Sequence, residues 1–169
     1  MDINKPDIRR MTEEALSAYF KEHGEKAFRG RQVYEWLWKK GSTSFEEMSN
    51  LSKETRKFLS ENFSIPRVTI HSKQTSRDGT VKFVFETNDG YLTESVLIPS
   101  GSRTTACVSS QIGCKLNCTF CATGKIPFKR NLTQAEIFDQ IMTVKKQSCE
   151  LYNLSLSNIV YMGMGEPLL

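Results

Sequence analysis

The apolar pattern of this 169-residue chain changes its period at Pro66, and this change constrains the fold more than any other feature. Before Pro66, apolar residues recur at helical spacing, as Leu16 and Phe20 do, which is typical of amphipathic helices. After Pro66, apolar and polar residues alternate, which is typical of strands with one buried face. We therefore predict an α+β protein with a helical accessory domain over residues 1–66 and a small antiparallel β segment over residues 67–100.

Capping residues indicate where the helices of the first segment begin and end. Thr12 and Ser52 can each accept a hydrogen bond from the first turn of a helix, and Gly41 can end the helix that starts near residue 30. We expect Trp36 and Trp38 to lie in the core or in a groove of this helical bundle.

Turn residues divide the β segment into three strands. Ser76–Gly79 and Asn88–Gly90 combine Asp or Asn with Gly, which favours tight turns between antiparallel strands. The third of these strands ends before Pro99. Three antiparallel strands are the simplest arrangement of this segment.

Residues 101–169 combine strands with a helix. A short strand is predicted over Thr105–Ser109 and another over Asn158–Met162. Between them, Thr133 and Glu136 form a capping box that opens a helix. A strand, a helix and a second strand in this order form one βαβ unit of a parallel sheet, and a single unit leaves a strand edge unpaired.

The composition excludes two classes of protein. With 38% hydrophobic and 25% charged residues, the chain has enough apolar material for a core, so wholesale disorder is excluded. No apolar run approaches the roughly 20 residues of a membrane-spanning helix, and we expect no membrane partner. The N-terminal sequence resembles no secretion signal and the five cysteines are an odd number, so we expect a reducing, cytoplasmic location.

Positive charge is concentrated in one part of the chain. Although the net charge is only +4, no acidic residue lies between Glu94 and Glu136. The basic residues in this stretch are Arg103, Lys115, Lys125, Lys129 and Arg130. Such a stretch attracts phosphate groups or a polyanion, although a solvated loop with a chance charge bias has the same composition.

Three cysteines with the spacing C-x3-C-x2-C carry the strongest chemical signal, at Cys114, Cys118 and Cys121. Their thiolates are close enough in sequence to face one metal centre. A structural zinc ion needs a fourth ligand, which would have to be Cys107 or Cys149 because both histidines lie far upstream. An iron–sulfur cluster held by three cysteines instead keeps one iron open for a substrate or cofactor, and this pattern describes such a catalytic cluster better.

The residue before the third cysteine is aromatic, Phe120, and with it the pattern resembles the signature of the radical S-adenosylmethionine (SAM) superfamily. The resemblance implies a 4Fe-4S cluster on Cys114, Cys118 and Cys121. It also implies that the open iron chelates SAM, which is then cleaved reductively to a 5′-deoxyadenosyl radical.

The last residues of the chain contain a second motif of this superfamily. Gly163–Pro167 is similar to its glycine-rich segment after the second barrel strand. The resemblance implies that Glu166 and the loop backbone meet the amino group of SAM, with Gly165 allowing a close approach.

Longer stretches resemble one family of this superfamily, the dual-specificity ribosomal and transfer RNA (adenine-C2)-methyltransferases. The matching stretches are Lys26–Trp36, Glu94–Pro99, Ala106–Cys114, Phe120–Gly124 and Met162–Leu169. The resemblance implies that residues 101–169 start a partial (β/α)6 barrel and that 23S rRNA and tRNA are the substrates. It also implies an external, flavodoxin-like electron donor and, for the full-length protein, a monomer.

Two further residues match positions that have assigned roles in that family. Glu94 matches the glutamate that accepts a proton, and Cys107 matches the cysteine that resolves the product through a transient disulfide. In the family, a methyl group is first placed on another cysteine near the C-terminus. A radical formed on that S-methyl group then adds to C2 of adenine.

RNA contacts are expected from basic and aromatic residues, because RNA loops are recognised through phosphate contacts and base stacking. The candidates are Arg29, Arg31, Trp36, Lys125, Lys129 and Arg130.

The sequence departs from the family after Cys121, where too few residues remain to complete the barrel. The methyl-carrying cysteine is absent, and Cys149 does not match it. We therefore expect the N-terminal part of such a methyltransferase, inactive by itself. Two alternatives stay open: the C8-methylating sister enzyme of antibiotic resistance, and a non-catalytic RNA-binding or iron–sulfur fragment.

Overall fold

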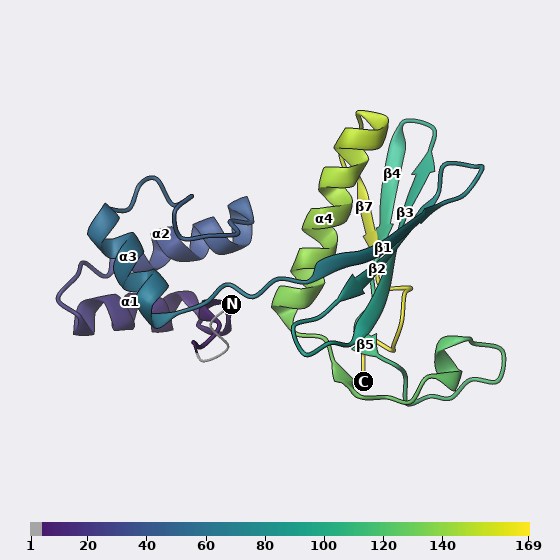
Figure 1. The fold of residues 1–169 in the computed structure, drawn as a ribbon, viewed down its shortest axis with the longest axis horizontal. Helices are drawn as coiled ribbons and strands as arrows, with labels where there is room; N and C mark the ends of the chain where they lie inside the picture. Colours follow the sequence, from purple (N-terminus) through teal and green to yellow (C-terminus); the bar gives the residue numbers. More distant parts are fainter. Residues whose placement is uncertain (1–4) are drawn as a thin grey trace. The chain divides into compact units, whose positions relative to one another are not determined.

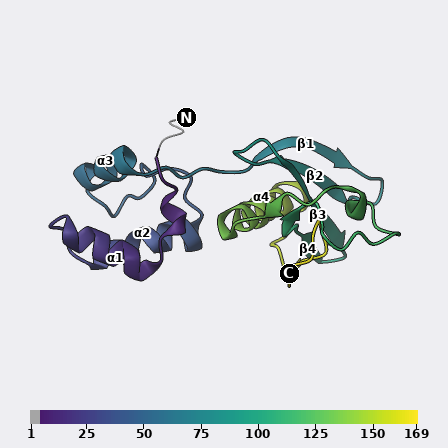
Figure 2. The same cartoon turned by 90° about the horizontal axis from the view of Figure 1, so that it is seen from below.

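The computed structural model describes residues 5–169 and divides into two compact units, with the boundary between Pro66 and Arg67 (Figures 1 and 2). Residues 1–4, with which the predicted helical domain begins, lie outside the described residues. Residues 67–100 and 101–169, which the sequence pattern separates, belong to one unit and contribute strands to one sheet.

The N-terminal unit is built from short helices. In chain order they are η1 (Ile8–Arg10), α1 (Glu13–Glu22), α2 (Phe28–Glu35), η2 (Trp36–Lys40) and α3 (Lys53–Asn62). The expected N-caps are confirmed, because Thr12 accepts a hydrogen bond from Ala15 N and Ser52 accepts one from Thr55 N. η2 is a π-helical segment that continues α2 and ends at Gly41, whose φ of 68° favours glycine.

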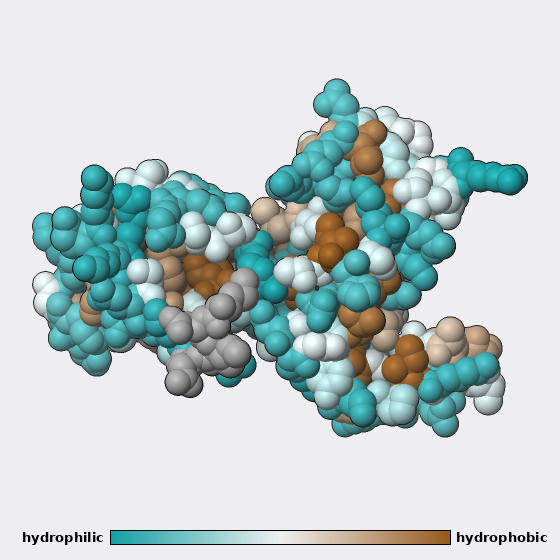
Figure 3. Space-filling model, viewed as in Figure 1, coloured by the Kyte–Doolittle hydropathy of each residue, from teal (hydrophilic) through white to brown (hydrophobic). Residues whose placement is uncertain are grey.

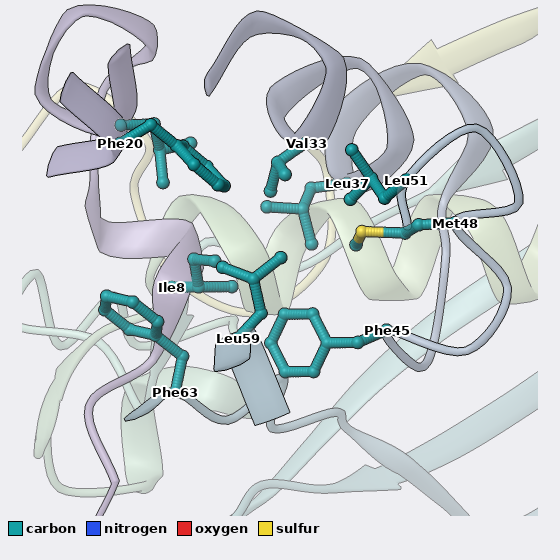
Figure 4. Close-up of a cluster of buried hydrophobic side chains, with 10 residues drawn as sticks. Ile8, Phe20, Val33, Leu37, Phe45, Met48, Leu51, Leu59 and Phe63 are labelled. Atoms are coloured by element: carbon teal, nitrogen blue, oxygen red, sulfur yellow. The ribbon is translucent and has the colours of Figure 1, made fainter. Parts of the chain in front are cut away.

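A single apolar core holds these helices together (Figure 4). Its buried members are Ile8, Leu16, Phe20, Val33, Leu37, Phe45, Met48, Leu51, Leu59 and Phe63. Trp36 and Trp38 pack against this core and are half-buried, in keeping with the expected position in the core or in a groove. The backbones of α1 and α2 approach closely at Gly30, where an added Cβ would lie 2.3 Å from Ser17 N.

The C-terminal unit contains a mixed five-stranded sheet. In spatial order its strands are β1 (Thr69–Thr75), β2 (Val81–Glu86), β3 (Leu92–Ser100), β4 (Arg103–Cys107) and β7 (Asn158–Val160). β1, β2 and β3 pair antiparallel, as the alternating pattern and the turn residues predict. β4 continues this antiparallel order by pairing with β3, which is not predicted from the sequence, and pairs in parallel with β7. The helix α4 (Gln134–Tyr152) connects β4 to β7, so the predicted βαβ unit is confirmed.

A small hairpin, not predicted from the sequence, precedes α4. β5 (Gln111–Ile112) pairs antiparallel with β6 (Arg130–Asn131). The loop between them carries the three cysteines and the short 3-10 helix η3 (Thr123–Lys125). Strands of two residues are too short to give a hydrophobic pattern, which is why the hairpin is missed.

α4 covers one face of the sheet (Figures 1 and 2). Its capping box of Thr133 and Glu136 is formed as predicted. The buried core between helix and sheet consists of Val68, Val81, Phe83, Phe85, Leu97, Ala106, Val108 and Val144.

Polar side chains of α4 are buried more completely than some of its apolar side chains. Ile137 and Ile141 pack against the core but are only half-buried, whereas Gln140 and Ser148 are 0% exposed. These two polar side chains are buried because both find hydrogen-bond partners in the sheet or the adjoining loops.

β7 lies at one edge of the sheet and β1 at the other. Several apolar side chains in and after β7 are exposed, with Ile159, Tyr161 and Met162 at 45%, 48% and 80%. The expected unpaired edge is therefore present in the part of the chain that the structure describes. Within residues 5–169, no helix combines the length and the apolar character that crossing a membrane requires.

Candidate functional site

Glu94 and Cys107 lie on the face of the sheet opposite α4. Along β3, Thr93 and Ser95 are buried on the helix side, so the residue between them points to the other face. Val96 pairs with Cys107, which places Cys107 on the same face as Glu94. The two are diagonal neighbours on adjacent strands, and residues in this arrangement are separated by about 7–8 Å. The structure therefore brings these two predicted site residues together.

The two side chains differ in their electrostatic surroundings. Lys82 Nζ lies 3.2 Å from Glu94 Oε1, and both side chains are about half exposed. Burial raises the pKa of the Cys107 thiol above its ordinary value, although a hydrogen bond from Met162 N opposes this shift. The raised pKa favours the protonated thiol of Cys107 at neutral pH.

The glycine-rich loop Gly163–Pro167 is fixed against the chain that follows β4. Met164 O accepts a hydrogen bond from Gln111 N at 3.2 Å, and Glu166 N donates one to Gln111 Oε1 at 3.0 Å. Gly165 has a φ of 97°, and an added Cβ would lie 2.4 Å from Gln111 Cβ. Only glycine fits this position, because the loop backbone packs directly against Gln111.

The cysteine loop projects from the sheet on the β5–β6 hairpin (Figure 1). It closes tightly at Gly113, whose φ is 74° and where an added Cβ would lie 2.3 Å from Pro127 O. Apolar residues are visible on it in Figure 3, and Phe120 is 92% exposed. The loop starts just after Gln111, the residue that contacts the glycine-rich loop, so both motifs have one common anchor.

The thiols of this loop are free but do not converge. All five cysteines of the chain, Cys107 included, are free thiols. Hydrogen bonds from the backbone N–H groups of Gly124 and Thr123 lower the pKa of Cys121 and so favour its thiolate. Within residues 5–169, no three His, Cys, Asp or Glu side chains are grouped closely enough to hold a metal ion.

The donor chemistry of the loop nevertheless fits an iron–sulfur cluster. Cys114, Cys118 and Cys121 are soft sulfur donors within a stretch of eight residues that contains no acidic side chain. Cys149 is exposed in the last turns of α4, at the opposite end of the sheet from the cysteine loop (Figure 1). Its position excludes it as a fourth ligand, as expected for a bystander.

Arg130 holds the base of the cysteine loop. Its guanidinium makes a bidentate contact with Asp89 in the β2–β3 turn, with distances of 2.7 and 2.8 Å. It also lies 2.8 Å from both carboxylate oxygens of Glu136, the N3 residue of α4. Arg130 is thereby satisfied within the chain, so the expectation that it contacts RNA is not supported by its surroundings.

The other candidate RNA contacts are placed differently. In the N-terminal unit, Arg29 donates to Gln32 Oε1 and Trp36 donates to Asn50 Oδ1. Arg31 lies near Glu13 and Glu35 but stays 68% exposed. On the cysteine loop, Lys125 and Lys129 form no ion pair with any described residue, which leaves their charges available.

Acid is expected to weaken the contact between Arg130 and Asp89. The hydrogen bond from Arg130 lowers the pKa of Asp89 from 3.8 to about 2. The folded state thus favours the ionised carboxylate, and this stabilisation is fully present above the unfolded pKa and lost as the pH falls from 3.8 towards 2. Because Asp89 is 46% exposed, solvent screening limits the effect to about 1 kcal/mol.

Urea unfolding at about pH 6 and about pH 3 measures this effect in the wild type and in Asp89→Asn. The stability lost between the two pH values should be smaller in Asp89→Asn by about 1 kcal/mol. Equal losses in both proteins would contradict the assignment of the shift to this contact.

Two site residues, Ser109 and Gln140, are not predicted from the sequence. Gln140 Oε1 accepts hydrogen bonds from Ser95 Oγ and Ser109 N, at 2.6 and 3.0 Å. Ser109 Oγ in turn accepts a hydrogen bond from Met164 N at 2.8 Å. The one sequence signal is that Glu136, Gln140 and Ser148 are polar at a spacing of four and eight residues along a helix that packs on a sheet.

Comparison with known proteins shows which family of proteins the chain is similar to. Residues 7–65 match the family described as "Ribosomal RNA large subunit methyltransferase N-terminal domain". The chain is 58% identical over 168 residues to a probable dual-specificity RNA methyltransferase RlmN of Cytophaga hutchinsonii, a match that covers 99% of this chain and 46% of the relative. It is 43% identical over 166 residues to the dual-specificity RNA methyltransferase RlmN of Geotalea uraniireducens, covering 98% and 47%.

A solved structure is also similar. The crystal structure of a radical SAM methyltransferase from Sphaerobacter thermophilus superposes with a TM-score of 0.82 at 34% sequence identity. The match covers 96% of this chain and 48% of that protein. The chain thus spans about half the length of the relatives that it matches.

Proposed function

We propose that this chain, which belongs to the RlmN family of dual-specificity RNA methyltransferases and corresponds to the N-terminal part of its relatives, takes part in methylating C2 of adenosine in 23S rRNA and tRNA. In this proposal, its βαβ unit is the start of a radical SAM barrel of the partial (β/α)6 type. The protein acts in the cytoplasm with an external, flavodoxin-like electron donor.

The observation that carries the proposal is the gathering of the motifs at one end of β4. Cys107 ends this strand, and Glu94 lies on the neighbouring strand and the same face. Gln111, four residues further along, contacts the glycine-rich loop and opens the hairpin that carries the cysteine loop. Ligands of α/β folds bind at the carboxyl ends of parallel strands, which is where these residues lie.

Two groups of residues have separate cofactor-binding tasks in this reaction. Cys114, Cys118 and Cys121 would hold the 4Fe-4S cluster, and the loop with Gly165 and Glu166 would bind the amino group of SAM. When bound, the cluster would supply the electron for the reductive cleavage of SAM. The lowered pKa of Cys121 supports the first task, since a thiolate is the metal-binding form.

Glu94 and Cys107 act on the RNA adduct. Glu94 accepts the proton that leaves C2 of adenine. Its half-exposed carboxylate, on the face of the sheet opposite α4, supports this role. Cys107, as the thiolate, would attack the sulfur of the methyl-carrying cysteine of the family. The S–S bond would form as the C–S bond of the adduct breaks, and the bonding electrons would leave with the methylated base. Burial keeps this thiol protonated until a base removes its proton.

Methylation of RNA in cells tests the proposal. The gene that carries this sequence is expressed in a bacterium whose own adenine-C2 methyltransferase has been deleted. 2-Methyladenosine and 8-methyladenosine are then quantified by mass spectrometry in 23S rRNA and tRNA. We expect 2-methyladenosine with the wild type and with Glu86→Gln, a matched change at the end of β2, but none with Glu94→Gln.

Each other result points to one of the alternatives. Formation of 8-methyladenosine alone would identify the C8-methylating sister activity. No methylated adenosine in either RNA would contradict the enzyme and leave the non-catalytic fragment.

A further inference from the structure

We propose that Ser109 is a positioning residue that ties the glycine-rich loop to the strand of Glu94, and that this tie holds the loop ready for SAM. The inference rests on the proposed function, because it assigns SAM to this loop. Ser109 lies two residues after the end of β4 and is 0% exposed.

The Ser109 hydroxyl joins two segments that are far apart in the sequence. It accepts a hydrogen bond from Met164 N in the glycine-rich loop, at 2.8 Å. It donates one to the backbone oxygen of Glu94 in β3, at 2.5 Å. A single oxygen atom therefore fixes the distance between the proposed SAM-binding loop and the strand that carries the proposed base.

Gln140 holds Ser109 in place from the helix. Its amide forms a two-point contact with the Ser109 backbone, in which Oε1 accepts from Ser109 N at 3.0 Å and Nε2 donates to Ser109 O at 3.2 Å. Oε1 also accepts from Ser95 Oγ at 2.6 Å. Both Gln140 and Ser95 are buried, so this network has no water to replace a lost partner.

The loop is fitted to the Ser109 hydroxyl. A Cβ added at Gly163 would lie 2.6 Å from Ser109 Oγ, which is closer than van der Waals contact allows. A side chain at this position would push the loop away from Ser109. The glycine thus makes the hydrogen bond to Met164 N possible.

A buried network of this kind could also serve stability alone. Ser148 provides the comparison, because it is equally buried and its hydroxyl donates to Leu154 O at 2.8 Å and lies 2.8 Å from Thr104 Oγ1. None of its hydrogen bonds reaches the glycine-rich loop. Ser109→Ala and Ser148→Ala therefore remove the same group from the same kind of site but differ in their link to the loop.

Two measurements on the cluster-loaded chain separate the roles. Hydrogen exchange reports the protection of the Met164 amide, and equilibrium dialysis with labelled SAM reports the dissociation constant. For Ser109→Ala we expect exchange at Met164 to be at least about tenfold faster and SAM binding about tenfold weaker, as for the loss of one buried hydrogen bond. Ser148→Ala should change neither by more than about twofold.

Gly163→Ala is expected to disrupt the same hydrogen bond, between Ser109 Oγ and Met164 N, by a change in the loop. It should also speed the exchange at Met164 and weaken SAM binding, and it keeps the proposal testable if Ser109→Ala does not fold. Wild-type binding of SAM together with equal behaviour of Ser109→Ala and Ser148→Ala would overturn the positioning role but not the proposed function. Absence of SAM binding in the wild type would overturn both.

Discussion

Replacing Cys118 by alanine is expected to abolish iron–sulfur loading of this chain. After anaerobic reconstitution, the wild type should hold about four iron atoms and Cys118→Ala close to none, because two cysteines do not retain a cubane cluster. The cysteines are free thiols on one projecting loop, and the Cys121 thiolate is already favoured by backbone hydrogen bonds. Iron and sulfide analysis, with the absorbance of the cluster, measures the result.

Cys149→Ala is the matched control, because it removes one thiol from an exposed position on α4. We expect it to load as much iron as the wild type. Equal iron in Cys118→Ala and the wild type would contradict the assignment of the ligands. A stoichiometric zinc ion that depends on Cys107 would instead favour the structural zinc site.

Replacing Phe83 by alanine is expected to destabilise the C-terminal unit by about 3–5 kcal/mol. Phe83 is 0% exposed in the core between α4 and the sheet, and its ring lies 6.0 Å from that of Phe85. The substitution leaves a cavity that the paired strands on both sides cannot fill. Hydrogen exchange of β2 and β3 amides in increasing urea measures the loss.

Val84→Ala is the control in the same strand, since Val84 is only half-buried and lies on the opposite face. It should cost about 1 kcal/mol. Both tryptophans lie in the N-terminal unit, so their fluorescence follows that unit separately. A loss below about 1 kcal/mol in Phe83→Ala would contradict the placement of this ring in the core.

Much of the fold follows from local patterns in the sequence. The change of period at Pro66, the caps at Thr12 and Ser52, and the capping box of α4 all have their physical basis within a few residues. The antiparallel strands follow from alternation and turn residues in the same way. Such features can be predicted because each depends on neighbouring residues only.

Features that depend on distant partners are missed. The β5–β6 hairpin is set by the loop that it closes, and the burial of Gln140 depends on Ser95 and Ser109, 45 and 31 residues away. The burial of the polar α4 residues Gln140 and Ser148 also depends on partners outside the helix. Arg130 likewise looks free in sequence because Asp89 lies 41 residues away.

In the candidate site, too, local motifs are predicted from the sequence and contacts between distant residues are not. The cysteine and glycine motifs are visible because they are short and specific, and the resemblance to a family assigns Glu94 and Cys107. Their common face depends on the sheet register, and the contact of the glycine-rich loop with Gln111 depends on the path of that loop in three dimensions.

In the proposed function, the cysteine loop and the glycine-rich loop together form a site where SAM would reach an iron–sulfur cluster. Electron paramagnetic resonance of the reconstituted, dithionite-reduced chain, recorded with and without SAM, decides whether they do. We predict the signal of a reduced 4Fe-4S cluster whose g values change when SAM is added, because three cysteines would leave one iron for SAM to bind. A cluster signal that is identical with and without SAM would contradict the claim.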